Sequence, residues 1–441
     1  MGSGHGHGGD TSGVAVARWA RIVVIVLLVA CGALAVVGVV KWWPDSGKVA
    51  QMQGLIPYTA EGVDIVKGRM VAVEPVCTFD SGVGSGIASG LSDGSGYVGG
   101  DGTADDGATD GGMTGDSPTP ACGDSQVQVL TGSLAGTTAD IALTPDIIAT
   151  GIAVGDSVYL IDTSGSGADP GTSLSYFRAD RDGPLWALLA VFIVVVVLVA
   201  WLRGLMALVS LAFAGLAVVG YLIPALMSGY PPVTVTLAAA VLILVVMLYL
   251  THGLSMRTSV ALLGALVGVG LSTVGASLGV VGTRLAGLGD ENAGLLVFNV
   301  DWIDVQQLVV ASVVLAGLGT LNDVTVTQAS ALWELRAAAP TMGRWRLFRA
   351  AMRIGRDHVA STVYTIVFAY LGTALVLLVA VQLYGGGPHW FLNSDQVAEE
   401  IVRVLVGGIA LLLAMPVTTA IGALVLGHGE AYQPKHAQGM I

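Results

Sequence analysis

The feature that most constrains this chain is a series of apolar runs, each long enough to cross a lipid bilayer. A bilayer core about 30 Å thick is spanned by roughly 20 apolar residues in an α-helix. The runs lie at residues 19–40, 184–202, 205–226, 232–251, 258–282, 305–322, 359–383 and 401–426. Of the 441 residues 54% are hydrophobic and 11% are charged, which is typical of membrane proteins. We therefore predict a polytopic α-helical membrane protein with about eight transmembrane helices.

Lys and Arg near the ends of the runs predict the orientation of these helices. Arg18 and Arg21 precede the first run, so placing them in the cytoplasm sets the side of every later connection. The other basic residues on the cytoplasmic side are then Arg203, Arg257, Arg336, Arg344, Arg346, Arg349, Arg353, Arg356 and Lys435. The short outer connections carry little beyond Arg284 and Arg403. Both termini are therefore expected in the cytoplasm.

The same boundaries divide the chain into consecutive parts. They are a disordered cytoplasmic tail at 1–18, a first transmembrane helix at 19–43, an extracytoplasmic domain at 44–183, a seven-helix membrane domain at 184–426, and a cytoplasmic tail at 427–441. We do not expect the first helix to be a cleaved signal peptide, because its core is long and Trp42 and Trp43 follow it as an aromatic interface anchor.

The extracytoplasmic domain is predicted to be a small β-barrel of the OB or SH3-like kind. Short β-type runs bounded by Gly, Pro, Asp or Ser occur at 68–76, 126–131, 137–143 and 157–161. The insertion at 79–121 is rich in Gly, Ser and Asp and is expected to be disordered. Residues 44–183 hold 19 acidic and 5 basic residues, so nucleic acid is not an expected partner.

Two cysteines bracket the insertion. Cys77 and Cys122 lie outside the predicted spans, whereas Cys31 lies within the first one. In an oxidising exterior we expect Cys77 and Cys122 to form a disulfide bond. Closing a loop of this length restricts the unfolded chain by roughly 4 kcal/mol in the entropy model. Free structural thiols are the alternative.

A polar stretch follows the sixth apolar run without a loop signal. Its candidate site residues are Asn322, Asp323, Thr327, Gln328, Ser330 and Glu334. If the stretch is helical, Asp323, Thr327, Ser330 and Glu334 share one face. Gly317 and Gly319 would permit a broken helix with a polar site inside the bilayer, as in many transporters. The alternative is that the span ends near Leu321 and that Asn322 or Asp323 caps a cytoplasmic helix.

Other polar groups could complete such a site. Asp357 and His358 open the seventh run, and Thr418 and Thr419 lie near the end of the eighth. In the predicted topology all of them lie near the inner side of the membrane, so they could meet in space. Asp357 beside His358 could serve a proton relay, or could cap the helix at the interface.

A basic segment at 340–358 reads as an amphipathic helix on the cytoplasmic surface. The arginines on its shared face are Arg346, Arg349, Arg353 and Arg356. We expect this face to contact anionic lipid headgroups, with docking of a cytoplasmic partner as the alternative. In the fifth run, the pairs Gly264–Gly268 and Gly275–Gly279 predict close helix packing.

Several motifs resemble the YibE/F family of bacterial multi-pass membrane proteins. They are LNDVTVTQASALWEL (321–335), RIGRDHVAST (353–362), AEEIVRVLVGGI (398–409) and PVTTAIGAL (416–424). The resemblance implies a bacterial plasma-membrane protein and supports the predicted architecture.

We expect the chain to be a transporter or permease for a small solute or ion, with its site at the inner end of the sixth helix. The alternative is a membrane sensor or scaffold whose outer β-domain binds a ligand or partner. The sequence contains no P-loop, nucleophile elbow or closed metal-ligand spacing. An enzyme, a cofactor and a bound metal are therefore not expected.

Overall fold

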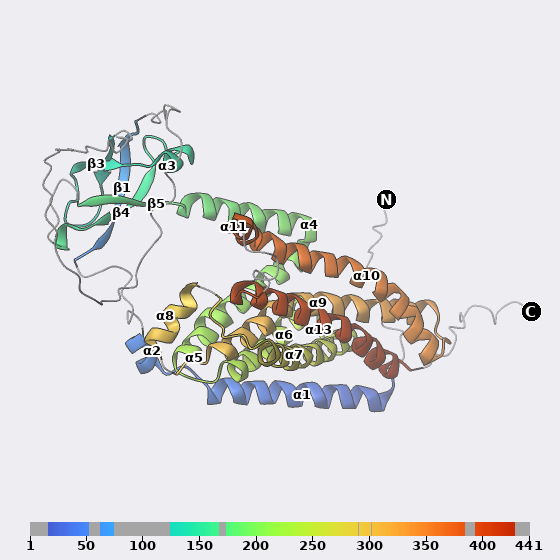
Figure 1. Ribbon diagram of the computed structural model, residues 1–441. Helices are drawn as coiled ribbons and strands as arrows, with labels where there is room; N and C mark the ends of the chain where they lie inside the picture. Colours follow the sequence, from blue (N-terminus) through green and yellow to red (C-terminus); the bar gives the residue numbers. More distant parts are fainter. Residues whose placement is uncertain are drawn as a thin grey trace, which may run out of the picture. The chain divides into compact units, whose positions relative to one another are not determined.

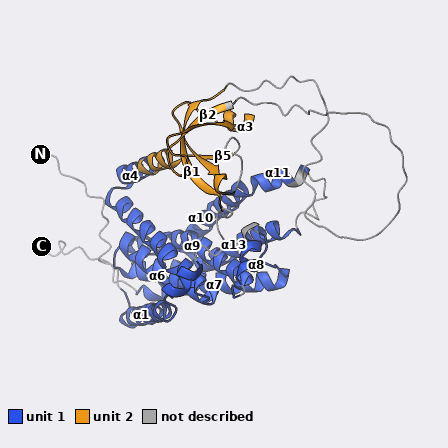
Figure 2. Cartoon of the chain, turned by 90° about the vertical axis from the view of Figure 1, so that its left-hand side faces the viewer, with its two compact units in different colours: residues 1–56, 191–441 blue, residues 57–190 orange. Residues whose placement is uncertain are grey.

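A computed structural model describes residues 16–52, 62–74, 124–166, 173–289, 291–300, 302–383 and 393–427. The chain divides into two compact units, which are coloured separately in Figure 2. The first comprises residues 1–56 and 191–441 and is called the membrane unit here. The second comprises residues 57–190 and is called the β unit.

The β unit contains one antiparallel sheet with the strand order β3-β2-β1-β4-β5. The strands are β1 (Asp64–Ala72), β2 (Asp124–Val129), β3 (Thr138–Ala142), β4 (Ser157–Asp162) and β5 (Leu174–Ala179), and the short helix α3 (Pro145–Ala149) joins β3 to β4. Alternating residues such as Val66, Val127 and Leu160 are buried, because successive side chains point to opposite faces of a strand. The edge strands β3 and β5 contact each other, so the sheet is curled.

Four of these strands coincide with the β-type runs expected from the sequence, and β5 was not predicted. The run that forms β5, LSYFRA, is as long as β2 and β4, but its large residues Tyr176 and Phe177 are adjacent, so it lacks a strict alternation. Cys77, Cys122 and the insertion at 79–121 lie outside the described residues, so their pairing and disorder stay predictions.

The membrane unit consists of helices (Figure 1). They are α1 (Arg18–Lys41), α2 (Ser46–Met52), α4 (Asp182–Ala217, which begins in the β unit), the π-helical turn Val218–Leu222, α5 (Ile223–Met227), α6 (Pro232–His252), α7 (Met256–Thr283), α8 (Glu291–Asn299), α9 (Val305–Ala338), α10 (Arg344–Thr373), α11 (Leu375–Leu383) and α13 (Asp395–Val425). In the described part of the chain, 6 helical stretches are long and apolar enough to cross a membrane: Arg18–Lys41, Asp182–Met227, Pro232–His252, Met256–Thr283, Val305–Ala338 and Asp395–Val425.

Each of the eight predicted runs lies on one or two of these helices. Runs 184–202 and 205–226 lie in the single stretch Asp182–Met227, but that stretch breaks at Trp201, whose φ is 52°. A positive φ is unfavourable for a bulky residue and interrupts the helix. The run at 359–383 lies on the second half of α10 and on α11. All of the predicted runs are therefore helical, although their boundaries differ.

Contacts between chain segments define two ends of the membrane unit. At one end, the Ala17 backbone N–H donates to the Val425 carbonyl at 3.1 Å, so the start of α1 meets the end of α13. We call this the proximal end. At the other, distal end, the Asp45 backbone N–H donates to Ser228 Oγ at 3.0 Å. The start of α1 and the end of α13 therefore lie on the same side of the unit.

Helix α9 corrects the expectations about the sixth run. It continues unbroken over 34 residues, which is about 51 Å of helix and longer than a bilayer core. It is not interrupted at Gly317 or Gly319, and neither Asn322 nor Asp323 caps a new helix. The polar stretch stays helical because its buried side, including Ala329 and Leu332, packs inside the unit.

The glycines of α7 allow the close packing predicted for them. A Cβ at Gly264 would overlap the side chain of Thr418 on α13. A Cβ at Gly268 would lie 2.6 Å from Leu321 Cδ2 on α9. Because lipid supplies little hydrophobic drive between helices, such close approach is a main source of helix association.

We predict that Gly264→Ala destabilises the membrane unit by about 1–3 kcal/mol, because the added methyl group overpacks the contact with Thr418. The matched control is Gly270→Ala on the same helix, where a Cβ would meet nothing within 4 Å. That control should be neutral or stabilising by about 0.5–1 kcal/mol. Unfolding of the purified protein in detergent measures both changes, and equal effects would contradict the packing role of Gly264.

Candidate functional site

The polar stretch of α9 has an exposed side and a buried side. Asp323, Thr327 and Glu334 are exposed and Ser330 is half-buried, so the four residues share a face as predicted. This face points out of the helix bundle. Gln328 lies on the opposite side and is only 3% exposed. The stretch therefore presents two separate polar surfaces.

Asp323 lies across the α9–α10 contact from His358. The Asp323 Oδ2 atom is 3.6 Å from His358 Nε2, which is close enough for an ion pair when the imidazole is protonated. The Asp323 side chain is 64% exposed and that of His358 is 35% exposed. The neighbouring Asn322 is half-buried, and its Oδ1 atom has no hydrogen-bond partner among the described residues. Asp357 is exposed.

Gln328 joins three helices at the buried side of the stretch. Its Nε2 atom donates to the Ala351 carbonyl on α10 at 3.1 Å and to Thr419 Oγ1 on α13 at 2.7 Å. Thr419 Oγ1 in turn donates to the Met415 carbonyl at 2.7 Å. Two of the expected contacts are therefore present: Gln328 donates a hydrogen bond to Thr419, and Asp323 lies near His358. The first is a satisfied network that fixes helix packing.

The arginines of the basic segment all lie on the exposed side of α10: Arg346, Arg349, Arg353 and Arg356. The other side of this helix carries Leu347 and Ala351, which are fully buried against the bundle. Trp345 stacks on Phe348 with ring centroids 5.3 Å apart, and the Arg349 guanidinium lies 5.6 Å from the Trp345 ring. The segment is continuous with the rest of α10 and does not form a separate helix.

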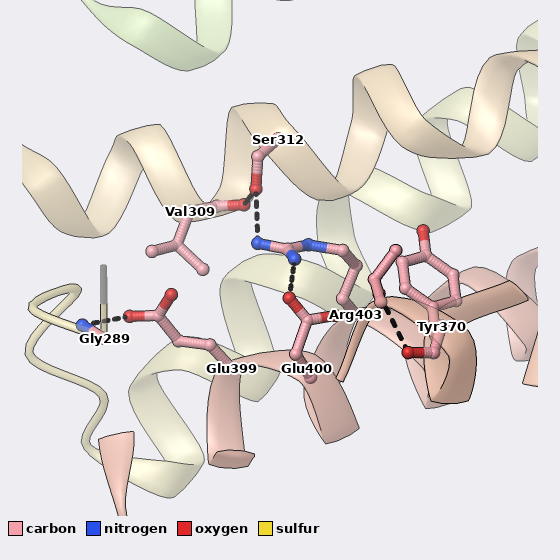
Figure 3. A network of polar contacts seen from close by, with 8 residues as sticks. Gly289, Val309, Ser312, Tyr370, Glu399, Glu400 and Arg403 are labelled. Atoms are coloured by element: carbon pink, nitrogen blue, oxygen red, sulfur yellow. Dashed lines mark hydrogen bonds and ion pairs between the residues drawn. The ribbon is translucent and has the colours of Figure 1, made fainter. Parts of the chain in front are cut away.

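A polar network at the distal end was not predicted as a site. Arg403 Nη1 pairs with Glu400 Oε1, and Arg403 Nη2 lies 3.4 Å from Ser312 Oγ on α9 (Figure 3). The adjacent Glu399 is 8% exposed and accepts a hydrogen bond from the Gly289 backbone N–H at 3.1 Å. Ser312 lies about 10 Å along α9 from its start, and the side chains of Arg403 and Glu400 are 21% and 31% exposed, so the ion pair is partly buried.

This network was missed because the eighth run was predicted to begin at residue 401, whereas α13 begins at Asp395. The signal that could have found it is the spacing of Glu400 and Arg403. Opposite charges three residues apart on a helix face each other and stabilise it, so they mark a helix that continues beyond its apolar run.

A small cavity lies beside α9, between the Arg403–Ser312 contact and Asp323. It has a volume of about 20 Å³, enough for one water molecule, and Gly317, Thr320, Tyr370 and Arg403 are among its lining residues. Asp323 lies about 27 Å along α9 from Val305, near the limit of a bilayer core. Polar groups therefore recur along the junction of α9, α10 and α13, from Arg403 through Thr320 to Asp323.

The 6 long apolar helical stretches in the described part of the chain are those expected of an α-helical membrane protein. The model of the YibE/F-like protein family matches residues 188–428, which is more than half of the chain. The chain belongs to this family, as the motifs in the sequence indicated. The match includes α9, α10 and α13 and begins after the β unit's sheet. No curated protein and no solved structure matches the chain significantly.

The contact between Gln328 and Thr419 is expected to couple α9 energetically to α13. We predict that Gln328→Leu and Thr419→Val each lower the free energy of unfolding, and that their combined effect falls short of the sum by about 1 kcal/mol. Thermal or denaturant unfolding in detergent measures this double-mutant cycle. The control cycle pairs Gln328→Leu with Thr365→Val, an exposed position on α10. The control should be additive, and equal coupling in both cycles would contradict the contact.

Proposed function

We propose that this protein moves a small solute or ion across the bacterial plasma membrane along the junction of α9, α10 and α13. The observation that carries the proposal is the recurrence of polar groups along this junction, from Arg403 and Ser312 through Thr320 to Asp323 and His358. Charged side chains are costly within a membrane and usually serve function there. Packing alone does not need the Arg403–Glu400 pair or the buried Asn322 oxygen without a partner.

In this proposal Asp323 and His358 form the inner end of the pathway. The exposed carboxylate can bind a cation, and the imidazole nitrogen beside it can donate or accept a hydrogen bond. Asn322 adds an amide beside them. The exposed face then continues toward the proximal end through Thr327, Ser330 and Glu334, and Asp357 adds a second carboxylate on α10.

The proposed orientation places the proximal end in the cytoplasm. The start of α1 meets the end of α13 there, which supports a common side for both termini. Arg18 and Arg21 lie at the start of α1, and the four arginines of the α10 face are near the start of that helix. Basic residues concentrate on the cytoplasmic side of membrane proteins. We further propose that the α10 face binds anionic headgroups, with the Trp345–Phe348 stack at the interface.

In the same proposal residues 44–183 lie outside the cell. The curled sheet, the contact of β3 with β5 and the position of α3 support a small barrel of the OB kind. Its net negative charge argues for a role with cations rather than with nucleic acid.

Removal of the inner carboxylates is expected to abolish transport. We predict that Asp323→Asn and Glu334→Gln reduce flux to background in proteoliposomes assayed for H⁺, Na⁺, K⁺, Mg²⁺ and Ca²⁺. The control is Asp140→Asn, which removes one exposed carboxylate from β3 in the β unit. If both α9 variants keep the full flux of the wild-type protein, the assignment of this site is wrong.

Cysteine-accessibility scanning separates transport from a sensor or scaffold role. Single cysteines are placed at positions 317–336 in a chain lacking Cys31, Cys77 and Cys122, and are labelled in native membranes with an impermeant thiol reagent. A pathway predicts positions that react from each side of the membrane. Reaction from the cytoplasm alone contradicts the pathway and favours the sensor or scaffold.

A further inference from the structure

A larger cavity opens at the distal end beside the polar network. Its volume is about 530 Å³, within the range of ligand-binding pockets. It lies between α11, the end of α10 and the first turns of α13. The polar side chains among its lining residues are Thr373, Gln396, Glu399, Glu400 and Arg403. It is distinct from the inner site at Asp323, which lies toward the other end of α9.

Among the residues that the structure describes, the charges around this cavity do not balance. Two carboxylates and one guanidinium of these residues line it, so the group carries a net charge of −1 when all three are ionised. The guanidinium of Arg403 is engaged by Glu400 and by Ser312. It also attracts Glu399, but Glu399 forms no ion pair among the described residues, and its only hydrogen bond there comes from Gly289 (Figure 3). Two carboxylates therefore share one positive charge, and Glu399 is the one not in contact with it.

A buried carboxylate that forms no ion pair is a favourable place for a cation. Transfer of an ionised carboxylate from water to a protein interior is strongly unfavourable unless it is paired. Glu399 is only 8% exposed yet lines an open cavity, so a cation placed in that cavity could contact it directly. The second oxygen of Glu400 is also buried without a hydrogen-bond partner in the described part of the chain, and it adds to the negative field.

We propose that this cavity binds a hard inorganic cation, with Glu399 as its principal ligand. Among the described lining residues the available donors are carboxylate and amide oxygens from Glu399, Glu400 and Gln396, and none of these residues is a cysteine or histidine. Oxygen donors select Na⁺, Mg²⁺ or Ca²⁺ over softer metals. The volume leaves room for several waters of hydration, which such cations usually keep. Arg403 holds Glu400 in place and limits the total negative charge.

The acidic outer segment supports the choice of a cation. The chain passes from the distal end of the membrane unit at Asp45 into residues 44–183, which carry 19 acidic and 5 basic residues. A strongly negative segment raises the local concentration of cations at the side of the membrane to which it is attached. The proposal concerns equilibrium binding and stands independently of transport.

Thermal unfolding of the full-length protein in detergent tests this site. Tryptophan fluorescence follows Tm while Na⁺, K⁺, Mg²⁺ or Ca²⁺ chloride is titrated, with choline chloride at equal ionic strength as the reference. Binding to the folded state raises Tm in proportion to the logarithm of the cation concentration. We expect this rise with at least one of the cations and its loss in Glu399→Gln. In cation-free buffer that variant should be at least as stable as the wild-type protein, because Gln still accepts the Gly289 hydrogen bond and carries no buried charge.

Two further variants make the result specific. Glu399→Asp keeps the charge and should retain a weakened Tm rise, and Glu74→Gln removes an exposed carboxylate from the β unit and should leave the rise unchanged. An undiminished rise in Glu399→Gln overturns the proposal, as does an equal rise with choline. A wild-type Tm that depends on pH but on none of the cations also overturns it, because a proton then neutralises Glu399.

Discussion

The close approach of α7 to α9 and α13 is the contact on which the rest of the membrane unit depends. Helices inside lipid gain little from the hydrophobic effect, so they associate through packing and hydrogen bonds between helices. Gly264 and Gly268 remove the side chains that would keep the three helices apart. Thr418 and Leu321 fill the space that these glycines leave. The same approach brings Gln328 of α9 within hydrogen-bonding distance of Thr419 on α13.

Polar groups in the membrane unit are of two kinds. Gln328, Thr418 and Thr419 lie in the tight core and find partners, so they stabilise one arrangement of the helices. Other buried side-chain atoms have no hydrogen-bond partner in the described residues, and buried polar atoms are normally paired. Some of these atoms lie outside the junction of α9, α10 and α13, on Tyr221, Thr236 and Ser272. Those on Asn322, His358 and Glu400 belong to the junction that we propose as a pathway.

Much of this architecture could be predicted from hydropathy and helical periodicity. All of the apolar runs are helical, and the shared face of Asp323 and Glu334 follows from the 3.6-residue repeat. The direction of that face could not be predicted, because it depends on which neighbouring helices cover α9. Hydropathy also predicted that helices end where charged residues begin, and for α9 this end was placed too early. In the structure α9 continues to Ala338 because α7, α10 and α13 pack around its polar part.

The start of α13 was also misplaced by hydropathy, and a polar network was missed as a result. An apolar run beginning at residue 401 excludes Glu399 and Glu400, although the helix begins at Asp395. Arg403 pairs with Glu400 on the same helix, and the Gly289 N–H donates to Glu399 from another part of the chain. A hydropathy profile shows neither contact. The spacing of Glu400 and Arg403 could have indicated the first, whereas the contacts of Glu399 with Gly289 and of Arg403 with Ser312 depend on the tertiary structure.

Movement along the proposed pathway requires the junction to widen between its two ends. The cavity there, about 20 Å³, holds a single water molecule, whereas a hydrated cation is larger. Helix α13 contains Gly407 and Gly408, where a Cβ would meet nothing within 4 Å, and Pro416, which cannot donate a helical hydrogen bond. Beyond Pro416 the hydroxyl of Thr419 accepts from Gln328 and donates to the Met415 carbonyl. An opening on the distal side of Pro416 would lengthen the 3.4 Å contact between Arg403 and Ser312 and would leave the Gln328–Thr419 contact in place.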